Sequence, residues 1–411
     1  MAARGDGRGP AIANRTAARI EVPVNQATHI VGVGMTAMDR RDRDPQDMAV
    51  EAALAALADA GLAPSAVGLV VFANATGGRL SDQGCIRGQS WLRNLGLGGA
   101  PVVNVDNSCA GGSSALHIGS MAAAAGRSPV LVIGVEKMWT GDRAATLRGV
   151  EDGLPADERE TMRSAHVNGA GSVLMGLNAT WVQRQLAERD TTVDQIAATA
   201  VKARRCAARN PLAQFRSPIT LQEVLASPVV AEPLTRLMCS SFTDGAAAAV
   251  LASGTTAGAP RIVASVARSG AGELDYHDRL RETVDEAWKS AGLGPEDVDV
   301  VELHDATSAE ELYALESLGF FEPGAAGPAT ASGATDIDGK AVTVNPSGGL
   351  VARGHPLAAT GIAQVAELTW QLRGVARGRQ VPGARVGLSV NTGGIIAGDT
   401  ALAAAHILVA G

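Results

Sequence analysis

The sequence predicts an α/β protein made of two similar halves, and two observations lead to this prediction. The segment AGLAPSAVGLVVFANAT at residues 60–76 is echoed half a chain later by AGLGPEDVDVVELHDAT at residues 291–307. In each, a glycine ends an amphipathic helix, a proline follows, and a short apolar run is typical of a buried strand. In addition, strand patterns alternate with helix patterns, as in parallel or mixed sheets covered by helices. Chance similarity is the alternative, since helix–turn–strand units are common, but the half-chain spacing favours duplication.

Each half contains the same succession of expected elements: an opening strand, an amphipathic helix, a glycine-rich turn with an alanine-rich helix, and a further apolar strand. We expect residues 1–24 to form a mobile leader, 25–258 the first half with an insertion at about 138–235, and 259–411 the second half. The expected elements are strands 29–35 and 261–267, helices 47–60 and 278–291, turn–helix segments 107–126 and 347–373, and strands 129–136 and 385–391.

Composition excludes several classes of protein. Apolar residues make up 46% of the 411 residues and aromatic residues only 3%, so the core must pack backbones closely instead of large rings. The net charge is −7 without a basic run, which argues against nucleic acid as a partner. No apolar run is long enough to span a membrane, and the N-terminus lacks the apolar core of a signal peptide. We therefore expect a cytoplasmic protein without a membrane partner.

The four cysteines are scattered and show no metal-ligand spacing, so we expect reduced thiols and no metal. Cys109 lies between the apolar run 101–105 and a helix of small residues that starts near residue 110. A helix N-terminus lowers the pKa of a thiol and can donate to an oxyanion. Cys109 is therefore a candidate nucleophile, and the alternative is a small buried residue, the usual fate of a free cysteine.

Two histidines are also candidate site residues, and each has a structural alternative. His304 and Asp305 end an expected strand, at the edge where open α/β sheets bind ligands. The alternative, which can hold at the same time, is that Asp305 or Thr307 caps the next helix with Glu310 as its capping-box partner. His355 lies in a glycine-rich loop that Pro356 stiffens. A fixed orientation of the side chain favours a functional histidine, and the alternative is a histidine at a helix start with no role.

A last glycine-rich segment, SVNTGGIIAGD at residues 389–399, follows a strand. We interpret it as a turn that brings backbone donors into a site.

These motifs together resemble the thiolase superfamily. NSCAGGSSAL is similar to the loop that carries the acyl-accepting cysteine, and GHPLAATG is similar to the histidine loop. IVGVGMT, LVIGVEKM, NPLAQFR and PLTRLMCSSFTDGAAAAVL resemble the sterol-carrier-protein-x branch, also called lipid-transfer-protein thiolases. The resemblance covers residue 29 to the C-terminus. It implies a five-layer αβαβα sandwich of two duplicated α/β halves, and a homodimer.

The resemblance also implies roles. Cys109 would accept an acyl group from a thioester, usually of coenzyme A, and His355 would activate the thiol and help to bind the thioester oxygen. The N–H of Cys109 and a glycine of the 391–394 turn would form a second oxyanion site, and His304 would belong to the catalytic set. No permanently bound cofactor is implied. The supporting residues would be Asn391, Gly393, Gly394, Glu310 and Asp305.

Two departures from the family pattern matter. Thiolases that join or cleave two acyl-CoA molecules use a second cysteine, and the two positions where the family places it hold Asn391 and Ala306. Glu310 stands where many members have an asparagine that holds an oxyanion water. The sequence therefore predicts acyl loading without standard acetoacetyl-CoA thiolysis.

Three interpretations remain open. The first is an acyltransferase that passes the acyl group from Cys109 to an acceptor. The second is a retro-aldol lyase acting on coenzyme A thioesters, which needs no cysteine nucleophile. The third is a non-catalytic subunit of a lipid-transfer-protein-type complex, in which a small OB-fold protein would be the partner. Contacts to coenzyme A require basic residues, and Arg205, Arg216 and Arg236 are equal candidates.

Overall fold

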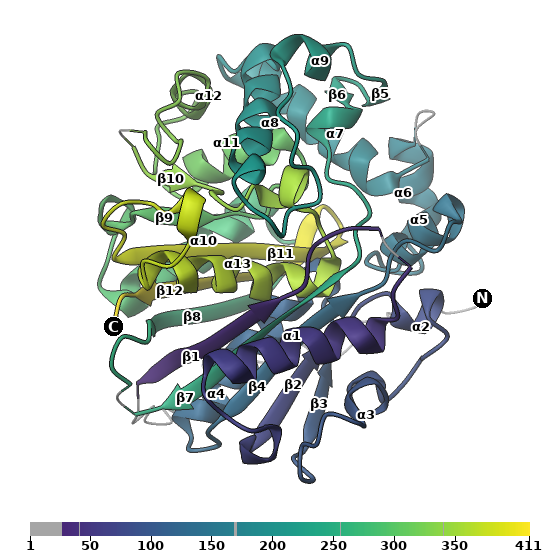
Figure 1. The fold of residues 1–411 in the computed structure, drawn as a ribbon. Helices are drawn as coiled ribbons and strands as arrows, with labels where there is room; N and C mark the ends of the chain where they lie inside the picture. The colour runs from purple at the N-terminus through teal and green to yellow at the C-terminus, as the bar shows by residue number, and fades with distance from the viewer. Residues whose placement is uncertain (1–26, 41, 168–170, 255, 340) are drawn as a thin grey trace, which may run out of the picture.

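The computed structural model describes residues 27–40, 42–167, 171–254, 256–339 and 341–411, so the expected leader lies outside the described residues. Its centre is a ten-stranded sheet in the order β10-β9-β11-β12-β8-β1-β7-β4-β2-β3 (Figure 1). β1 and β8 join its two five-stranded portions through only two residue pairs. The strands of the first portion are β1 (Thr28–Met35), β2 (Leu69–Ala73), β3 (Val102–Val105), β4 (Val130–Glu136) and β7 (Gly245–Ser253).

The two portions have the same topology. In each, the first strand in chain order pairs antiparallel with the last, and the last pairs antiparallel with the fourth. The fourth then pairs parallel with the second, and the second parallel with the third. The predicted duplication is confirmed. The strands of the second portion are β8 (Arg261–Ser269), β9 (Val300–Glu302), β10 (Thr343–Val344), β11 (Val386–Ile396) and β12 (Asp399–Val409).

Helices complete the five predicted layers. α4 (Gly111–Ala124) and α13 (Leu357–Leu372) pack on each other and against strands of both sheet portions. α1 (Pro45–Asp59) covers the outer face of the first portion, and α10 (Tyr276–Ala291) covers that of the second. Within the described ranges no helix has the length and apolarity to cross a membrane. The shorter helices are α2 (Gly77–Leu80), α3 (Arg87–Leu92), α11 (Ser308–Ser317) and α12 (Ala326–Ala331).

The central layer depends on backbone contact. A Cβ on Gly134 of β4 would lie 2.2 Å from the carbonyl oxygen of Ala358 in α13. A Cβ on Gly112 of α4 would lie 2.4 Å from the same oxygen. Small residues are therefore required where α13 crosses both its neighbours, which explains a buried core with few aromatic residues.

The chain between β4 and β7 forms a cover over one end of the sheets, at the top and right of Figure 1. It corresponds to the region in which the sequence predicts an insertion. Its elements are α5 (Arg143–Glu151), α6 (Arg159–His166), α7 (Val173–Glu188), α8 (Val193–Ala208), α9 (Leu221–Leu225), β5 (Val229–Ala231) and β6 (Leu234–Thr235).

One sequence expectation is wrong. The glycines at 393 and 394 do not form a turn, because β11 continues through them to Ile396. The pairing with β12 steps from Gly393–Leu402 to Ile395–Thr400, so it persists across the glycines. The turn comes at Ala397 and Gly398, both with positive φ. The glycines serve a different purpose: a Cβ on Gly393 would lie 2.3 Å from the backbone nitrogen of Ala110.

We expect Gly134→Ala to destabilise the protein by about 1–3 kcal/mol, because the added methyl group must displace the α13 backbone. The free energy of unfolding in denaturant measures this effect. Gly84→Ala is the matched control, since no atom lies within 4 Å of a Cβ there, and it should change stability by less than about 0.5 kcal/mol. Equal effects of the two substitutions would contradict the packing argument.

Candidate active site

Cys109 lies in the short connection between β3 and α4. A 3-10 turn spans Ser108–Ala110, and Ser108 has a φ of +50°, a conformation that turns the chain sharply just before the cysteine. The thiol is only 8% exposed and lines a cavity of about 660 Å³. The Ser108 hydroxyl donates to its sulfur at 3.8 Å. The packing of this turn against Gly393 fixes the sulfur at the end of β11.

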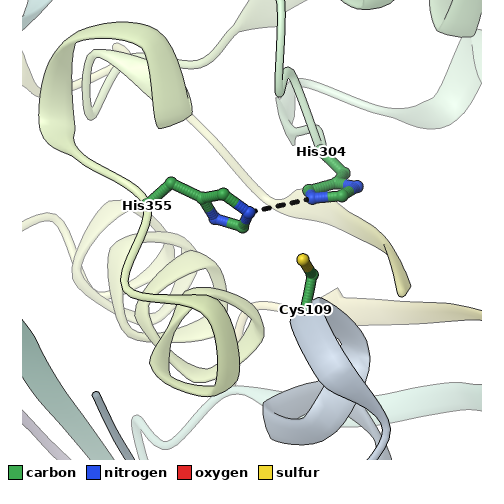
Figure 2. A group of neighbouring side chains, drawn as sticks. All are labelled: Cys109, His304 and His355. Carbon is green, nitrogen blue, oxygen red and sulfur yellow. Dashed lines mark hydrogen bonds between the residues drawn. The ribbon is translucent and has the colours of Figure 1, made fainter. Parts of the chain in front are cut away.

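His304 and His355 meet Cys109 in this cavity. The sulfur and one ring nitrogen of each histidine all lie within 4.8 Å of one another. The two Nε2 atoms are 3.5 Å apart, and the sulfur points toward the gap between the rings (Figure 2). The structure therefore brings together the three residues that the sequence predicts as catalytic. A thiolate and two imidazoles are also ligands that zinc accepts, although the cysteine spacing in the sequence predicts no metal.

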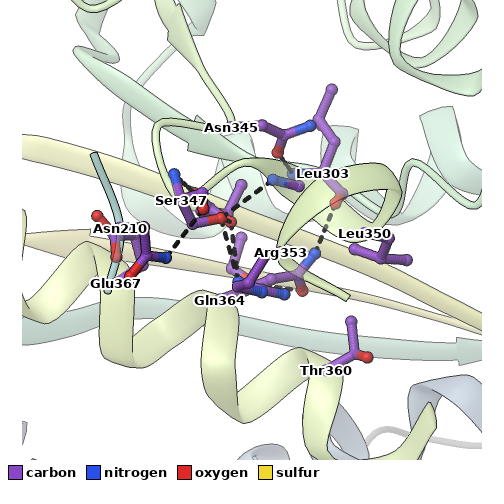
Figure 3. A network of polar contacts seen from close by, with 12 residues as sticks. Asn210, Leu303, Asn345, Ser347, Leu350, Arg353, Thr360, Gln364 and Glu367 are labelled. Carbon is purple, nitrogen blue, oxygen red and sulfur yellow. Dashed lines mark hydrogen bonds and ion pairs between the residues drawn. The ribbon is translucent and has the colours of Figure 1, made fainter. Parts of the chain in front are cut away.

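A buried ion pair holds the two histidine loops. The guanidinium of Arg353 lies 3.2 Å from the carboxylate of Glu302, and both side chains are completely buried. Ser347 donates its hydroxyl to Glu302 at 2.7 Å. Its oxygen also accepts from Arg353 at 3.3 Å (Figure 3). Glu302 precedes His304 by two residues, and Arg353 precedes His355 by two. The pair therefore fixes the backbones from which both imidazoles project.

Neutral side chains extend this scaffold. Gln364 of α13 donates to the backbone carbonyl of Leu303 at 2.8 Å (Figure 3). It also donates to the backbone carbonyl of Val390, at 3.2 Å. The side-chain oxygen Oδ1 of Asn345 accepts from Leu303 N at 2.8 Å. Asp305, a predicted support residue, accepts from Leu350 N at 2.8 Å and does not line the cavity. Burial raises its pKa well above the usual range. Asp305 thus ties the His304 loop to the turn before His355.

Hydrogen bonds determine which nitrogen of His355 carries the proton. The carbonyl of Pro356 can only accept, so the Thr360 hydroxyl donates to it, at 3.3 Å. Thr360 then accepts from Nδ1–H of His355, at 2.8 Å. In the neutral ring this leaves Nε2 as a lone pair. The basic nitrogen of His355 therefore lies in the same group of atoms as His304 Nε2 and the Cys109 sulfur.

The same reasoning extends to His304. If Nε2 of His355 is an acceptor, Nε2–H of His304 must be the donor across the 3.5 Å contact. Nδ1 of His304 then accepts from the hydroxyl of Thr392, at 2.5 Å. Thr392 in turn accepts from the hydroxyl of Tyr276, at 2.7 Å. One direction of donation runs through the whole chain. Neither Tyr276 nor Thr392 was identified from the sequence.

Burial controls the charges at the site. It lowers the pKa of His304 to about 4 and that of His355 to well below its usual value, with the neighbouring histidine adding to the effect on His355. Burial raises the pKa of Cys109 to about 12, in spite of the hydrogen bond from Ser108. The expectation of a lowered thiol pKa is therefore wrong. The resting site holds a thiol and two neutral imidazoles.

The other predicted support residues have different environments. Gly393 and Gly394 line the cavity. Asn391 does not line it, and both polar atoms of its buried side chain lack a hydrogen-bond partner among the described residues. Successive residues of a strand face opposite sides. Thr392, not Asn391, therefore faces the histidines, as the preceding contacts show.

Glu310 lines the cavity at the start of α11, and its Oε2 atom lies 3.4 Å from Nε2 of His277. The alternative capping role is not observed. Thr307 occupies the cap position of α11 without a side-chain cap bond, and only its carbonyl accepts from Glu310 N. A role for Glu310 in holding an oxyanion water stays a prediction.

Basic residues gather in the cavity wall. Of the three arginines considered from the sequence, only Arg236 lines the cavity, and Arg205 instead forms an ion pair with Asp336. Arg40, Arg143 and Arg204 line it as well. The sequence contained no signal for these, because they come from three segments of the chain that are distant from one another.

The comparisons with known proteins agree with this geometry. Residues 28–255 match the thiolase N-terminal domain, and residues 268–406 match the thiolase C-terminal domain-like family. The chain is 38% identical over 392 residues to an acetyl-CoA acetyltransferase of Methanothermobacter thermautotrophicus, covering 92% of this chain and 98% of the relative. The protein belongs to the thiolase family.

Within the family, the resemblance to the sterol-carrier-protein branch also holds. The chain is 35% identical to sterol carrier protein 2 of Bos taurus over 392 residues, covering 90% of this chain and 71% of that protein. Among solved structures, the one titled "Ltp2-ChsH2(DUF35) aldolase" shares the fold with a TM-score of 0.76. It is 24% identical and covers 93% of this chain and 98% of the other.

We expect Thr392→Val to change the protonation of His304. Valine cannot donate to Nδ1, so the ring loses the bond that keeps its proton on Nε2. Nitrogen NMR of histidine-labelled protein distinguishes the two neutral tautomers, and the variant should show a mixture. The lost hydrogen bonds should also cost about 1–3 kcal/mol of stability. Thr392→Ser keeps the hydroxyl and should restore both properties. An unchanged tautomer in the valine variant would refute the donation chain.

We also expect His304 and His355 to remain neutral in mildly acidic solution. Burial disfavours the imidazolium, so the proton is taken up only below the ordinary pKa of about 6.5. An exposed histidine would be about 90% protonated at pH 5.5. Ring-proton NMR shifts, assigned with His304→Gln and His355→Gln, should stay constant from pH 8 to 5.5. A midpoint near 6.5 for either ring would show that the site is more hydrated than the structure indicates.

Proposed function

We propose that the protein takes an acyl group from a coenzyme A thioester onto Cys109 and passes it to an acceptor other than a second acyl-CoA. The observation that carries this proposal is that the Cys109 sulfur and one ring nitrogen of each of two neutral imidazoles lie within 4.8 Å of one another. Nucleophilic acyl transfer needs a base and an oxyanion donor in this arrangement. The acyltransferase among the relatives supports the same class of reaction.

The geometry supports transfer of the acyl group from coenzyme A to Cys109, with His355 carrying the proton. When the thioester carbonyl enters the site, the hydrogen bond between His304 and His355 opens. Nε2 of His355 then accepts the thiol proton as Sγ of Cys109 attacks the carbonyl carbon, since a thiol with a pKa of about 12 is not ionised beforehand. The carbonyl oxygen gains the negative charge and accepts hydrogen bonds from Nε2–H of His304 and from the imidazolium of His355. The carbon–sulfur bond to coenzyme A then breaks, and its thiolate takes the proton from His355. The product is a thioester on Cys109.

Backbone donors support the oxyanion. Gly393 lies against the Cys109 turn and lines the same cavity. We propose that the N–H groups of Cys109 and of Gly393 or Gly394 bind the oxygen of the second tetrahedral intermediate, in which the acceptor attacks the acyl-enzyme. The four arginines in the cavity wall supply positive charge for the phosphates of coenzyme A.

The acceptor step differs from that of a two-cysteine thiolase. Ala306 lines the cavity but does not titrate, and Asn391 does not line it. Condensation of two acetyl-CoA molecules is therefore expected to be slow. The structural neighbour titled as an aldolase keeps the retro-aldol alternative in view, but that reaction leaves Cys109 without a role.

The same title names a second component, ChsH2(DUF35). It supports the proposal that this protein also works with a small OB-fold partner. The homodimer and the cytoplasmic location are further proposals, which rest on the resemblance stated for the sequence.

The test is covalent loading. We expect incubation with acetyl-CoA to add one acetyl group to the intact protein, detected by mass spectrometry, and Cys109→Ala to abolish the adduct. Cys85→Ala is the control, because Cys85 is exposed and has no part in the proposed reaction. Loading should persist after dialysis against EDTA, since no step requires a metal. The same preparation should form little acetoacetyl-CoA.

Absence of an adduct in the wild-type protein, with acetyl-CoA and longer acyl-CoA alike, would refute the proposal. It would leave the lyase or the non-catalytic subunit as the better interpretation. An adduct that survives Cys109→Ala would refute the assignment of the nucleophile.

A further inference from the structure

The active-site cavity has an open end and a closed end. Among its lining residues, Arg40, Arg143 and Arg236 are exposed, which places them at the mouth. Glu310 and Tyr276 line the same cavity but are only 2% and 6% exposed. A thioester with its charged coenzyme A at the arginines and its carbonyl at Cys109 would direct its acyl chain toward the closed end. This step rests on the proposed function.

Glu310 is an unsatisfied acceptor at that end. Its Oε1 atom is buried and has no hydrogen-bond partner among the described residues. Its Oε2 atom lies 3.4 Å from Nε2 of His277, and that nitrogen has no hydrogen-bond partner in the part of the chain that the structure describes. A buried carboxylate without a donor is costly. A donor supplied by a bound molecule would offset that cost.

A second acceptor lines the same cavity. Asn178 of α7 donates its amide to Leu174 O at 2.9 Å, and its Oδ1 atom is buried without a partner in the described part of the chain. Asn178 lies one helical turn before Trp181, whose ring is 4.8 Å from that of Tyr276. Asn178 therefore lies on α7 close to the tilted ring pair of Trp181 and Tyr276.

Aromatic residues are concentrated around Glu310 although the chain has few of them. The chain contains only two tyrosines, and both lie here. The His277 ring is 5.1 Å from that of Tyr276 and 6.0 Å from that of Tyr313. The hydroxyl of Tyr313 is also buried without a hydrogen-bond partner. Of these three residues, Tyr276 lines the cavity, whereas His277 and Tyr313 do not.

We infer that Glu310, with Asn178 and Tyr276, forms a subsite for a hydrogen-bond-donating substituent on the acyl group, a hydroxyl or an amine. The carboxylate accepts the hydrogen bond, and the rings of Tyr276 and Trp181 flank the carbon chain. The subsite favours acyl groups that carry a polar substituent, whereas an apolar pocket would favour a plain fatty acyl chain. Sites built to bind a substrate hydroxyl reject the analogue that lacks it, because their own polar groups are left unpaired.

Isosteric acyl-CoA pairs test this inference. Each pair differs by replacement of a hydroxyl with a methyl group: 3-hydroxybutyryl- with 3-methylbutyryl-CoA, 4-hydroxybutyryl- with pentanoyl-CoA, and 5-hydroxypentanoyl- with hexanoyl-CoA. The rate of adduct formation on Cys109 is measured at limiting thioester. In at least one pair we expect the hydroxylated member to load about tenfold to a hundredfold faster, the range for one hydrogen bond to a charged group.

Variants identify the residue responsible. Glu310→Leu should abolish or invert the preference, and the isosteric Glu310→Gln should weaken it while retaining the fold, as thermal unfolding will verify. Glu296→Gln removes an exposed carboxylate of the same half and should leave the preference unchanged. Equal loading within all three pairs would overturn the inference but leave the proposed function standing. A preference that persists in Glu310→Leu would also overturn it. No loading by any thioester would instead refute the proposed function.

Discussion

The buried pair of Glu302 and Arg353 is the constraint on which the active site depends. Neither side chain reaches solvent, and burial raises the pKa of Glu302 to about 7 while the guanidinium opposes the shift. Removing one partner of such a pair typically costs about 3–5 kcal/mol, because the other charge stays buried. The pair lies two residues before each histidine, so any displacement of it separates the imidazoles from each other and from Cys109.

The reactivity of the resting site depends on the positions of its side chains and not on a thiolate that is already ionised. Because Cys109 has a pKa of about 12, the sulfur remains a thiol, and oxidants and alkylating agents, which react with thiolates, find little to attack. Proton transfer to His355 is instead coupled to attack on the thioester. The direction of hydrogen bonds from Tyr276 to Thr360 prepares both rings for that moment, one as base and the other as donor.

The sequence predicted what is carried by local patterns. The duplication was visible as a repeat and the set of Cys109, His304 and His355 lay in motifs, while the five layers followed from the family resemblance. What it missed depends on contacts across the chain: Thr392 is separated by 88 residues from His304 and by 116 from Tyr276. The family pattern points to Asn391, which stands at one position of the second cysteine. In a strand the next residue faces the opposite side, and it is Thr392 that contacts His304. The pKa of Cys109 was misjudged because burial, which outweighs the helix end, cannot be read from a motif.

The division of labour among the three parts of the chain has an evolutionary consequence. The first half supplies the nucleophile and the second half the histidines. The segment between β4 and β7 supplies Asn178, Trp181 and several of the cavity arginines, but none of the three reacting side chains. Substitutions in that cover can therefore retune which molecules are accepted without disturbing the chemistry. Substitutions in the two halves, by contrast, must preserve the arrangement of Cys109 with the two histidines. An exchange of the cover segment is therefore a route to new substrates.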